Sequence, residues 1–165
     1  MHSVNFILIM GVSGCGKTTV GKRLAKRLGW DFYDADDFHP PVNIEKMSQG
    51  MPLNDTDRAL WLETLHALIS SCSQANQPGV LACSALKEQY RLTLLDGNPG
   101  VQIVYLKGSY DLIWSRLSSR TKHYMKPNML KSQLIALEEP KNALVINIED
   151  SVEQIVDIIC EEIFP

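Results

Sequence analysis

The sequence predicts an α/β domain in which a mostly parallel sheet carries helices on both faces. Residues 5–10 (NFILIM) form a continuous apolar run that leads directly into a glycine-rich loop, which is typical of a strand buried on both sides. Later short apolar runs are separated from one another by segments in which apolar residues recur at helical spacing. Parallel neighbours in a sheet need such crossover segments, so the alternation indicates parallel strands.

Five strands and the helices between them follow from this pattern. The strands are expected at residues 5–10, 30–34, 80–83, 101–106 and 143–148. The helices are expected at residues 17–28, 43–49, 55–73, 87–95 and 128–139, and in two segments that begin at Ser109 and Ser151. Asp55 is the expected N-cap of the longest helix, while Gly29 and Pro140 are expected to end two others. All elements belong to one domain over residues 1–165.

Composition excludes several classes of protein. With 45% hydrophobic and 21% charged residues, the 165-residue chain has the balance of a folded domain rather than a disordered one. The longest apolar run, residues 6–10, is too short to span a bilayer, and residues 1–5 lack the basic flank of a signal peptide. We therefore expect a cytoplasmic protein without a membrane partner.

Cysteine spacing and net charge argue against further kinds of site and partner. Cys15, Cys72, Cys83 and Cys160 show no C-x-x-C spacing, which argues against a disulfide framework or a structural zinc site and predicts reduced thiols. The net charge is −3, and the sequence has no stripe of lysine and arginine. Nucleic acid is therefore not an expected partner.

A phosphate-binding loop is predicted at residues 11–18. The run GVSGCGKT matches G-x-x-x-x-G-K-[ST] and lies between a predicted strand and a predicted helix, the context in which backbone N–H groups surround a phosphate. The alternative is a glycine-rich turn with a chance lysine. The predicted nucleotide-binding residues are Gly11, Val12, Ser13, Gly14, Cys15, Gly16, Lys17, Thr18 and Thr19.

The loop predicts ATP and Mg²⁺ as cofactors. Lys17 is expected to reach the β- and γ-phosphates as a catalytic group, and the Thr18 hydroxyl is expected to ligate Mg²⁺. Positive charge around Cys15 is expected to lower its thiol pKa, which would favour a redox role. The alternative is that the loop tolerates a small side chain at this position.

An acidic turn follows the second predicted strand. Residues 34–40 read DADDFHP and leave the carboxyl edge of the sheet, where open α/β folds bind ligands. One of Asp34 and Asp36 would hold hydrated Mg²⁺, and the other would orient or deprotonate an attacking hydroxyl. The alternative is a pair of solvated turn aspartates.

Two arginines precede a polar segment that has the character of a lid. Arg116 and Arg120 are four residues apart on one helical face, and residues 121–127 follow them. Closure of this segment would bring one or both arginines onto the transferring phosphate. The alternative is a charged surface face.

Motifs along the whole chain resemble the gluconate kinase family of P-loop kinases. They are residues 34–58 (DADDFHPPVNIEKMSQGMPLNDTDR), 83–91 (CSALKEQYR), 123–125 (HYM) and 132–140 (SQLIALEEP). The resemblance, which extends to shikimate kinases, implies the small-kinase fold with sheet order 2-3-1-4-5 and a short lid. It also implies transfer of the γ-phosphate of ATP to the 6-hydroxyl of D-gluconate, and it favours a homodimer. The rivals are another small-molecule kinase of this fold and an ATP-binding switch without catalysis.

The resemblance also assigns individual residues. It makes Asp36 the contact or base for the acceptor hydroxyl and Asp34 the metal carboxylate acting through water, although these two roles are interchangeable at this stage. It makes Arg58 the partner of the acid's carboxylate. It places the stretch after Pro140, residues 141–143, beside the adenine, and Pro140 itself is a predicted nucleotide-binding residue. The remaining predicted substrate-binding residues are His39, Ser84, Ala85, Lys87, Arg91 and His123. For His39, Lys87 and Arg91, a helix-capping or solvated role is an equal alternative.

Overall fold

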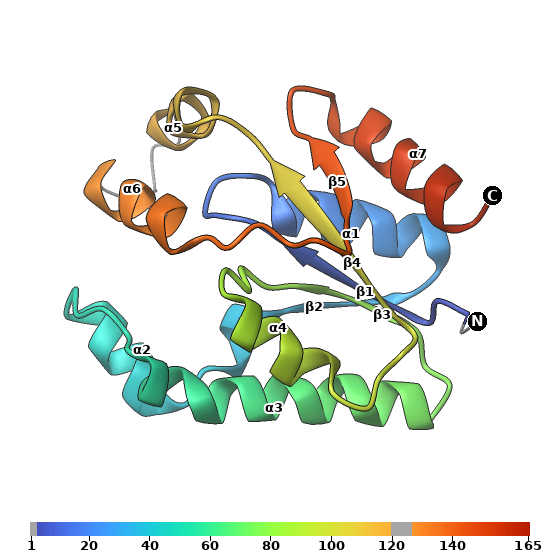
Figure 1. Cartoon of the computed structure of the whole chain (residues 1–165), viewed down its shortest axis with the longest axis horizontal. Helices are drawn as coiled ribbons and strands as arrows, with labels where there is room; N and C mark the ends of the chain where they lie inside the picture. The colour runs from blue at the N-terminus through green and yellow to red at the C-terminus, as the bar shows by residue number, and fades with distance from the viewer. Residues whose placement is uncertain (1–2, 120–126) are drawn as a thin grey trace.

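The computed structural model describes residues 3–119 and 127–165, and it contains a five-stranded parallel sheet (Figure 1). The strands are β1 (Phe6–Met10), β2 (Asp31–Asp34), β3 (Gly79–Ala82), β4 (Val101–Lys107) and β5 (Leu144–Asn147). Their order is β2-β3-β1-β4-β5, and every neighbouring pair is parallel. The predicted sheet order is therefore confirmed, and every predicted strand is present with its ends shifted by at most one residue.

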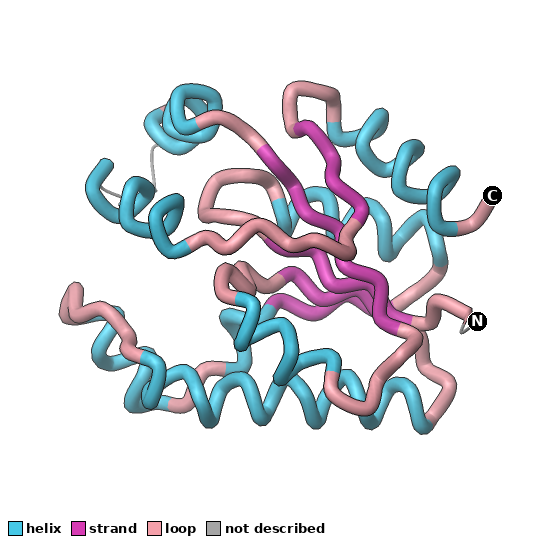
Figure 2. The backbone as a smooth tube through the Cα atoms, viewed as in Figure 1, coloured by secondary structure: helices cyan, strands magenta, loops and turns pink. Residues whose placement is uncertain are grey.

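Helices cover both faces of this sheet, as Figure 2 shows. They are α1 (Lys17–Leu28), α2 (Pro41–Ser48), α3 (Asp55–Gln74), α4 (Glu88–Leu95), α5 (Tyr110–Ser118), α6 (Pro127–Ala136) and α7 (Val152–Ile163). In Figure 1, α3 and α4 lie on one side of the sheet, and α1 and α7 lie on the other. Among the described helices, none combines the length and apolar character that a membrane crossing requires.

The central strand β1 divides the core into two halves. Ile7 and Ile9 pack into the half that contains residues of α1 and α7, whereas Phe6, Leu8 and Met10 pack into the half that contains residues of α3 and α4. All five side chains are fully buried, which explains why this strand is apolar without alternation. The glycine loop that follows β1 is thereby attached to a fully buried central strand.

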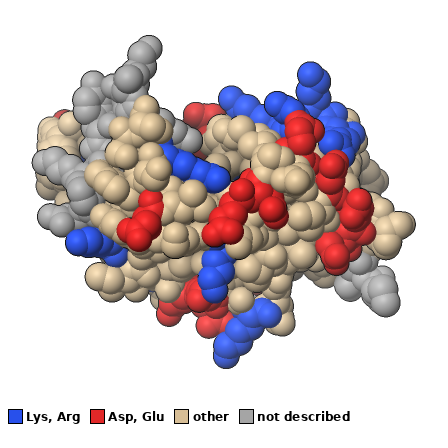
Figure 3. Space-filling view, turned by 90° about the horizontal axis from the view of Figure 1, so that it is seen from above, with Lys and Arg blue, Asp and Glu red and all other residues tan. Residues whose placement is uncertain are grey.

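The outer surface of the α1 and α7 pair is charged. Arg23 and Arg27 of α1 pair with Glu153, and Arg27 also pairs with Asp157 at 2.8 Å. Figure 3 shows basic and acidic side chains close together on one face of the molecule. Exposed pairs of this kind contribute at most about 1 kcal/mol each, so the apolar core positions these helices.

The start of α3 and the end of α6 differ from the sequence prediction. The N-cap of α3 is Asn54 rather than Asp55, because the Asn54 side chain accepts from the Asp57 N–H while Asp57 accepts from the Asn54 N–H. Helix α6 ends at Ala136 rather than continuing to residue 139. The Glu138 N–H instead donates to the Leu86 carbonyl at 2.8 Å, a tertiary contact that ends the helix early.

The acidic turn is a short helix. Residues Ala35–Phe38 form the 3₁₀ helix η1, and the Asp34 carboxylate caps it by accepting from the Asp36 N–H at 3.0 Å. The backbone then enters α2, which begins at Pro41, two residues before the predicted start. Most of the predicted lid, residues 121–126, lies outside the described residues, and residue 127 begins α6.

Candidate active site

The phosphate-binding loop connects β1 to α1 at the carboxyl edge of the sheet. Gly14 has φ +83°, and a Cβ at this position would lie 2.5 Å from Leu117 Cγ, so only glycine fits beneath α5. The Gly11 N–H donates to the Ser84 carbonyl at 3.3 Å, which places the residues after β3 against the loop. The predicted neighbours Ser84 and Ala85 thus lie at the floor of the loop, and Ala85 adopts φ +45°.

Two basic side chains near the loop, Lys17 and Arg116 of α5, donate to protein carbonyls. Lys17 Nζ donates to the Val12 carbonyl at 3.1 Å, within its own loop. Arg116 Nη2 donates to the carbonyl of Ile148, the residue directly after β5. Both side chains are flexible cations beside the phosphate loop, and each can exchange a carbonyl for a phosphate oxygen. Arg120, predicted on the same face as Arg116, lies outside the described residues.

The prediction that the pKa of the Cys15 thiol is lowered is wrong. Its side chain is buried, and this burial raises the pKa of Cys15 although Lys17 and Arg116 act in the opposite direction. The thiol therefore stays protonated, and it packs as a small apolar group beneath the loop.

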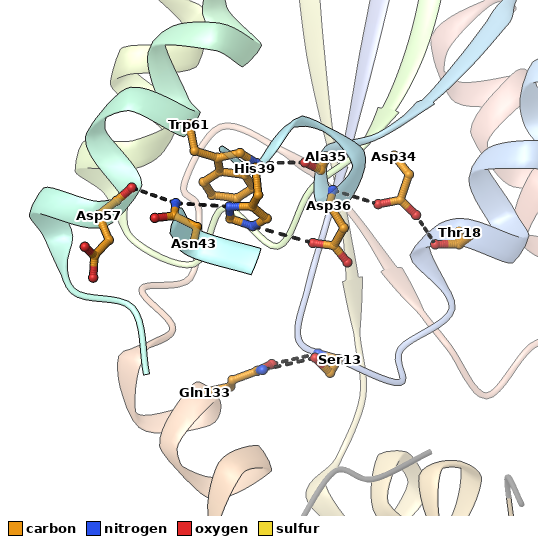
Figure 4. Close-up of polar contacts among 10 residues, drawn as sticks. All are labelled: Ser13, Thr18, Asp34, Ala35, Asp36, His39, Asn43, Asp57, Trp61 and Gln133. Atoms are coloured by element: carbon orange, nitrogen blue, oxygen red, sulfur yellow. Dashed lines mark hydrogen bonds and ion pairs between the residues drawn. The ribbon is translucent and has the colours of Figure 1, made fainter. Parts of the chain in front are cut away.

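Thr18 and Asp34, the two residues predicted to hold Mg²⁺, lie in hydrogen-bond contact. The Thr18 hydroxyl donates to Asp34 Oδ2 at 3.0 Å, while Asp34 Oδ1 accepts from the Asp36 N–H (Figure 4). The carboxylate therefore links the start of α1 to η1. A hydroxyl beside a carboxylate is a donor set that suits Mg²⁺, which usually takes one or two protein oxygens together with water and phosphate.

Asp36 projects from η1 into solvent near this pair. Its side chain is 88% exposed. Neighbouring protein atoms raise the pKa of Asp36 by desolvation and the Asp34 carboxylate raises it further, while His39 and Lys17 lower it. The raised pKa suits a carboxylate that accepts a proton from a bound hydroxyl.

His39 lies next to Asp36 but is enclosed by protein. Its imidazole is 5% exposed and stacks on the Trp61 indole with ring centroids 4.4 Å apart. Nε2 lies 4.0 Å from Asp36 Oδ1, and Nδ1 lies 3.3 Å from the Asn43 amide nitrogen. Burial is the first cause that lowers the pKa of His39, and Arg58 lowers it further while Asp36 raises it. The neutral imidazole is therefore favoured, and it has little surface left for direct contact with a substrate.

A second charged cluster lies between α3 and α4. Arg58 donates to the Tyr90 hydroxyl at 3.3 Å, and this hydroxyl donates to Asp55 at 2.5 Å. Lys87 donates to the same carboxylate at 3.4 Å, and both cations lie over the Tyr90 ring. The structure thus brings the predicted residues Arg58 and Lys87 together. Tyr90 was missed as a site residue, although it lies in the quoted segment 83–91.

Arg91 connects two backbone segments through hydrogen bonds. Its buried guanidinium donates to the carbonyls of Ala85, Leu86 and Glu138 at 2.7, 3.1 and 2.7 Å. The guanidinium of Arg91 donates to all three carbonyls, so it connects the segment after β3 to the segment after α6. The geometry favours a structural role for Arg91, which is neither the predicted substrate contact nor the helix-capping or solvated alternative. Pro140 lies in the same segment after α6, on the way to β5.

Gln133 of α6 is a further residue that sequence reasoning missed. Its Oε1 accepts from the Ser13 N–H at 2.8 Å, and its Nε2 donates to the Ser13 hydroxyl at 3.0 Å (Figure 4). The only signal was its place in the quoted segment 132–140. The predicted substrate residue His123 lies outside the described residues.

Comparison with known proteins decides the family. A probable gluconokinase of Mus musculus is 41% identical, with 98% of this chain and 98% of that protein aligned. The thermoresistant gluconokinase of Escherichia coli K12 is 42% identical over 94% of this chain and 91% of its own length. The chain belongs to the gluconokinase family. A family model described as shikimate kinase also matches residues 13–163.

Solved structures agree with this membership of the gluconokinase family. A crystal structure of a gluconokinase from Sinorhizobium meliloti 1021 superimposes with a TM-score of 0.82 at 38% identity, covering 95% of this chain and 90% of that one. A shikimate kinase from Bacteroides thetaiotaomicron superimposes with a TM-score of 0.67 at 21% identity, which shows a shared fold. Members of these families are ATP-dependent kinases that phosphorylate a hydroxyl group.

Proposed function

We propose that this protein is a gluconokinase that transfers the γ-phosphate of ATP to the 6-hydroxyl of D-gluconate, giving 6-phospho-D-gluconate and ADP. The observation that carries the proposal is the chain of contacts from Thr18 through Asp34 to the Asp36 N–H. It connects the phosphate-binding loop with the acidic helix η1. A nucleotide on the loop and an acceptor beside Asp36 would therefore share one site.

The loop and its cations would hold the nucleotide. Backbone N–H groups of residues 13–16 and the start of α1 would receive the phosphates, and Lys17 would leave the Val12 carbonyl for phosphate oxygens. Arg116 would approach the γ-phosphate from α5. The Thr18 hydroxyl and, through water, the Asp34 carboxylate would hold Mg²⁺, which neutralises phosphate charge.

The transfer step needs one group to receive a proton. The acceptor oxygen forms a bond to the γ-phosphorus as the bond from that phosphorus to the β–γ bridging oxygen breaks, and ADP leaves with the electron pair. The hydroxyl proton moves to the Asp36 carboxylate. We assign this role to Asp36 rather than Asp34, because both Asp34 oxygens already accept hydrogen bonds from protein groups.

The cations between α3 and α4 would receive the acid end of the substrate. Arg58 offers a planar guanidinium that can bind a carboxylate at two points, and Lys87 adds a second positive charge. Asp55 now occupies the position between Tyr90 and Lys87. A substrate carboxylate would compete with that side chain for the same donors.

An assay of ADP release across a panel of acceptors tests the proposal. Gluconate should give turnover well above the background ATPase rate, whereas shikimate and nucleoside monophosphates should not. If shikimate or a nucleotide is the better acceptor, the protein is a different kinase of the same fold. If ATP binds but no acceptor raises turnover, the protein is a nucleotide-binding switch.

A matched pair of variants tests the assignment of the base. Asp36→Asn should lower kcat with gluconate by roughly a hundredfold or more and leave ATP affinity unchanged. Asp37→Asn, the neighbouring exposed position in η1, should retain kcat within about twofold. Equal activity of the two variants would remove Asp36 from the mechanism.

A further inference from the structure

The imidazole of His39 is held in one orientation by aromatic packing. It lies nearly parallel to the Trp61 indole, with an angle of 12° between the rings. Trp61 is itself fixed, because its buried Nε1–H donates to the Ala35 carbonyl at 2.7 Å. The indole thus ties α3 to η1 and supports the histidine that follows η1. A ring stacked in this way and almost fully buried cannot rotate freely.

Hydrogen bonding to Asn43 selects the tautomer of His39. Asn43 Nδ2 donates to the Asp57 carbonyl at 2.9 Å, which fixes the orientation of the amide because the opposite orientation would place two oxygens together. The same nitrogen lies 3.3 Å from His39 Nδ1 and presents its second hydrogen to it. Nδ1 must then be the acceptor, so the proton of the neutral ring is on Nε2.

The protonated Nε2 faces the proposed base. It lies 4.0 Å from Asp36 Oδ1, which is longer than a hydrogen bond but close enough for a small side-chain movement to form one (Figure 4). Catalytic hydrogen bonds are often long in the free enzyme and shorten when the substrate is bound. The ring has no comparable route to the acceptor, because its exposed fraction is only 5%.

Resting on the proposed function, we propose that His39 is a positioning residue that donates Nε2–H to Asp36 Oδ1 and leaves Oδ2 directed at the acceptor hydroxyl. Asn43 and Trp61 keep the Nε2–H of His39 directed at Asp36. Without His39, the exposed Asp36 side chain would sample several rotamers, and fewer of them would meet the hydroxyl. This role differs from the direct substrate contact that the resemblance implied for His39. The lowered pKa of His39 agrees with a neutral ring that has only one proton to donate.

Long-range proton–nitrogen correlation NMR tests the tautomer without any need for activity. The imidazole of His39 should show the pattern of a protonated Nε2 and an unprotonated Nδ1 at neutral pH. Asn43→Leu should shift this pattern toward a tautomer mixture, because it removes the donor to Nδ1. A protonated Nδ1, or a doubly protonated ring at neutral pH, would overturn the proposal whether or not the protein phosphorylates gluconate.

Kinetics of three variants test the consequence for the reaction. His39→Phe keeps a ring on Trp61 but removes the donor, and it should lower kcat with gluconate by roughly tenfold while leaving the KM for gluconate and the affinity for ATP unchanged. His39→Gln places an amide N–H near the position of Nε2 and should recover part of that loss. His66→Phe is the matched control, because His66 lies in the middle of α3, binds the Asp96 carbonyl at the C-terminal end of α4, and should affect stability alone.

The results of these experiments distinguish a failure of the positioning role of His39 from a failure of the proposed function. If the wild-type protein does not phosphorylate gluconate, the proposed function fails, and the NMR result alone judges the orientation of His39. If the wild type is active and His39→Phe retains full kcat, or His39→Gln is no better than His39→Phe, the positioning role is wrong. A raised KM for gluconate at unchanged kcat would make His39 a substrate contact instead, which also overturns the proposal.

Discussion

Ser13 and Gln133 bind each other through two hydrogen bonds, although 120 positions separate them in the chain. One of these bonds uses the Ser13 N–H, a backbone donor of the phosphate-binding loop. Helix α6 therefore reaches into the loop and satisfies a donor that a nucleotide phosphate would otherwise receive. The relationship makes Gln133 a competitor of a nucleotide phosphate for the Ser13 N–H.

Removing this competitor should tighten nucleotide binding. We expect Gln133→Ala to raise the affinity for a non-hydrolysable ATP analogue by roughly two- to tenfold, which corresponds to the net contribution of one or two hydrogen bonds. Isothermal titration calorimetry measures the change. Ile135→Ala is the matched control, because this side chain lies on the same helix and is 86% exposed. Weaker binding in Gln133→Ala would mean that the glutamine contacts the nucleotide itself.

The Tyr90 hydroxyl should matter for the acceptor and not for ATP. Tyr90→Phe removes the group that accepts from Arg58 and donates to Asp55, so the guanidinium loses one of its constraints. We expect the KM for gluconate to rise by roughly three- to tenfold, with the KM for ATP unchanged. Steady-state kinetics with each substrate varied in turn supply both values. A change confined to the KM for ATP would contradict the placement of the acceptor near α3 and α4.

Loss of the Arg91 guanidinium should destabilise the fold. Arg91→Met leaves three backbone carbonyls without their donors, and we expect the free energy of unfolding to fall by about 2–4 kcal/mol. Urea denaturation followed by circular dichroism measures the loss. The exposed neighbour Gln89→Ala on the same helix should change stability by less than about 0.5 kcal/mol. A similarly small effect of Arg91→Met would show that solvent replaces these hydrogen bonds without cost.

Burial of His39 should make stability depend on pH in the mildly acidic range. Its folded-state pKa lies below the ordinary 6.5, so the unfolded chain binds this proton more readily. The contribution of the neutral ring is therefore complete above pH 6.5 and is lost as the pH falls toward the folded-state pKa. Urea denaturation should show that the stability advantage of wild type over His39→Gln shrinks between pH 7.5 and 5.5. An advantage that grows on acidification would mean that Asp36 outweighs burial and raises the pKa of His39.

Local sequence patterns were sufficient to predict the strands and the phosphate-binding loop, whereas the order of the strands in the sheet came from the family resemblance. The apolar run of β1, the glycine loop and the start of α1 are adjacent in the chain, so hydrophobic periodicity and a short motif predict them together. Asp34 could be placed at the same edge, because the carboxyl ends of parallel strands meet there. The contact between Thr18 and Asp34 follows from that shared edge.

Tertiary packing alone decided which polar groups meet each other and which remain free. Arg91 and Gln133 are polar residues in predicted helices, and their partners come from segments distant in the chain, so no local pattern could assign them. Burial likewise reversed the expected pKa shift of Cys15, because desolvation depends on the surrounding atoms rather than on neighbours in sequence. The sequence by itself thus determined the order of the elements and the phosphate-binding chemistry, while the folded structure decided the orientation of His39 toward Asp36. The physical reason is that periodicity and motifs act over a few residues, whereas hydrogen-bond partners and desolvation depend on all elements at once.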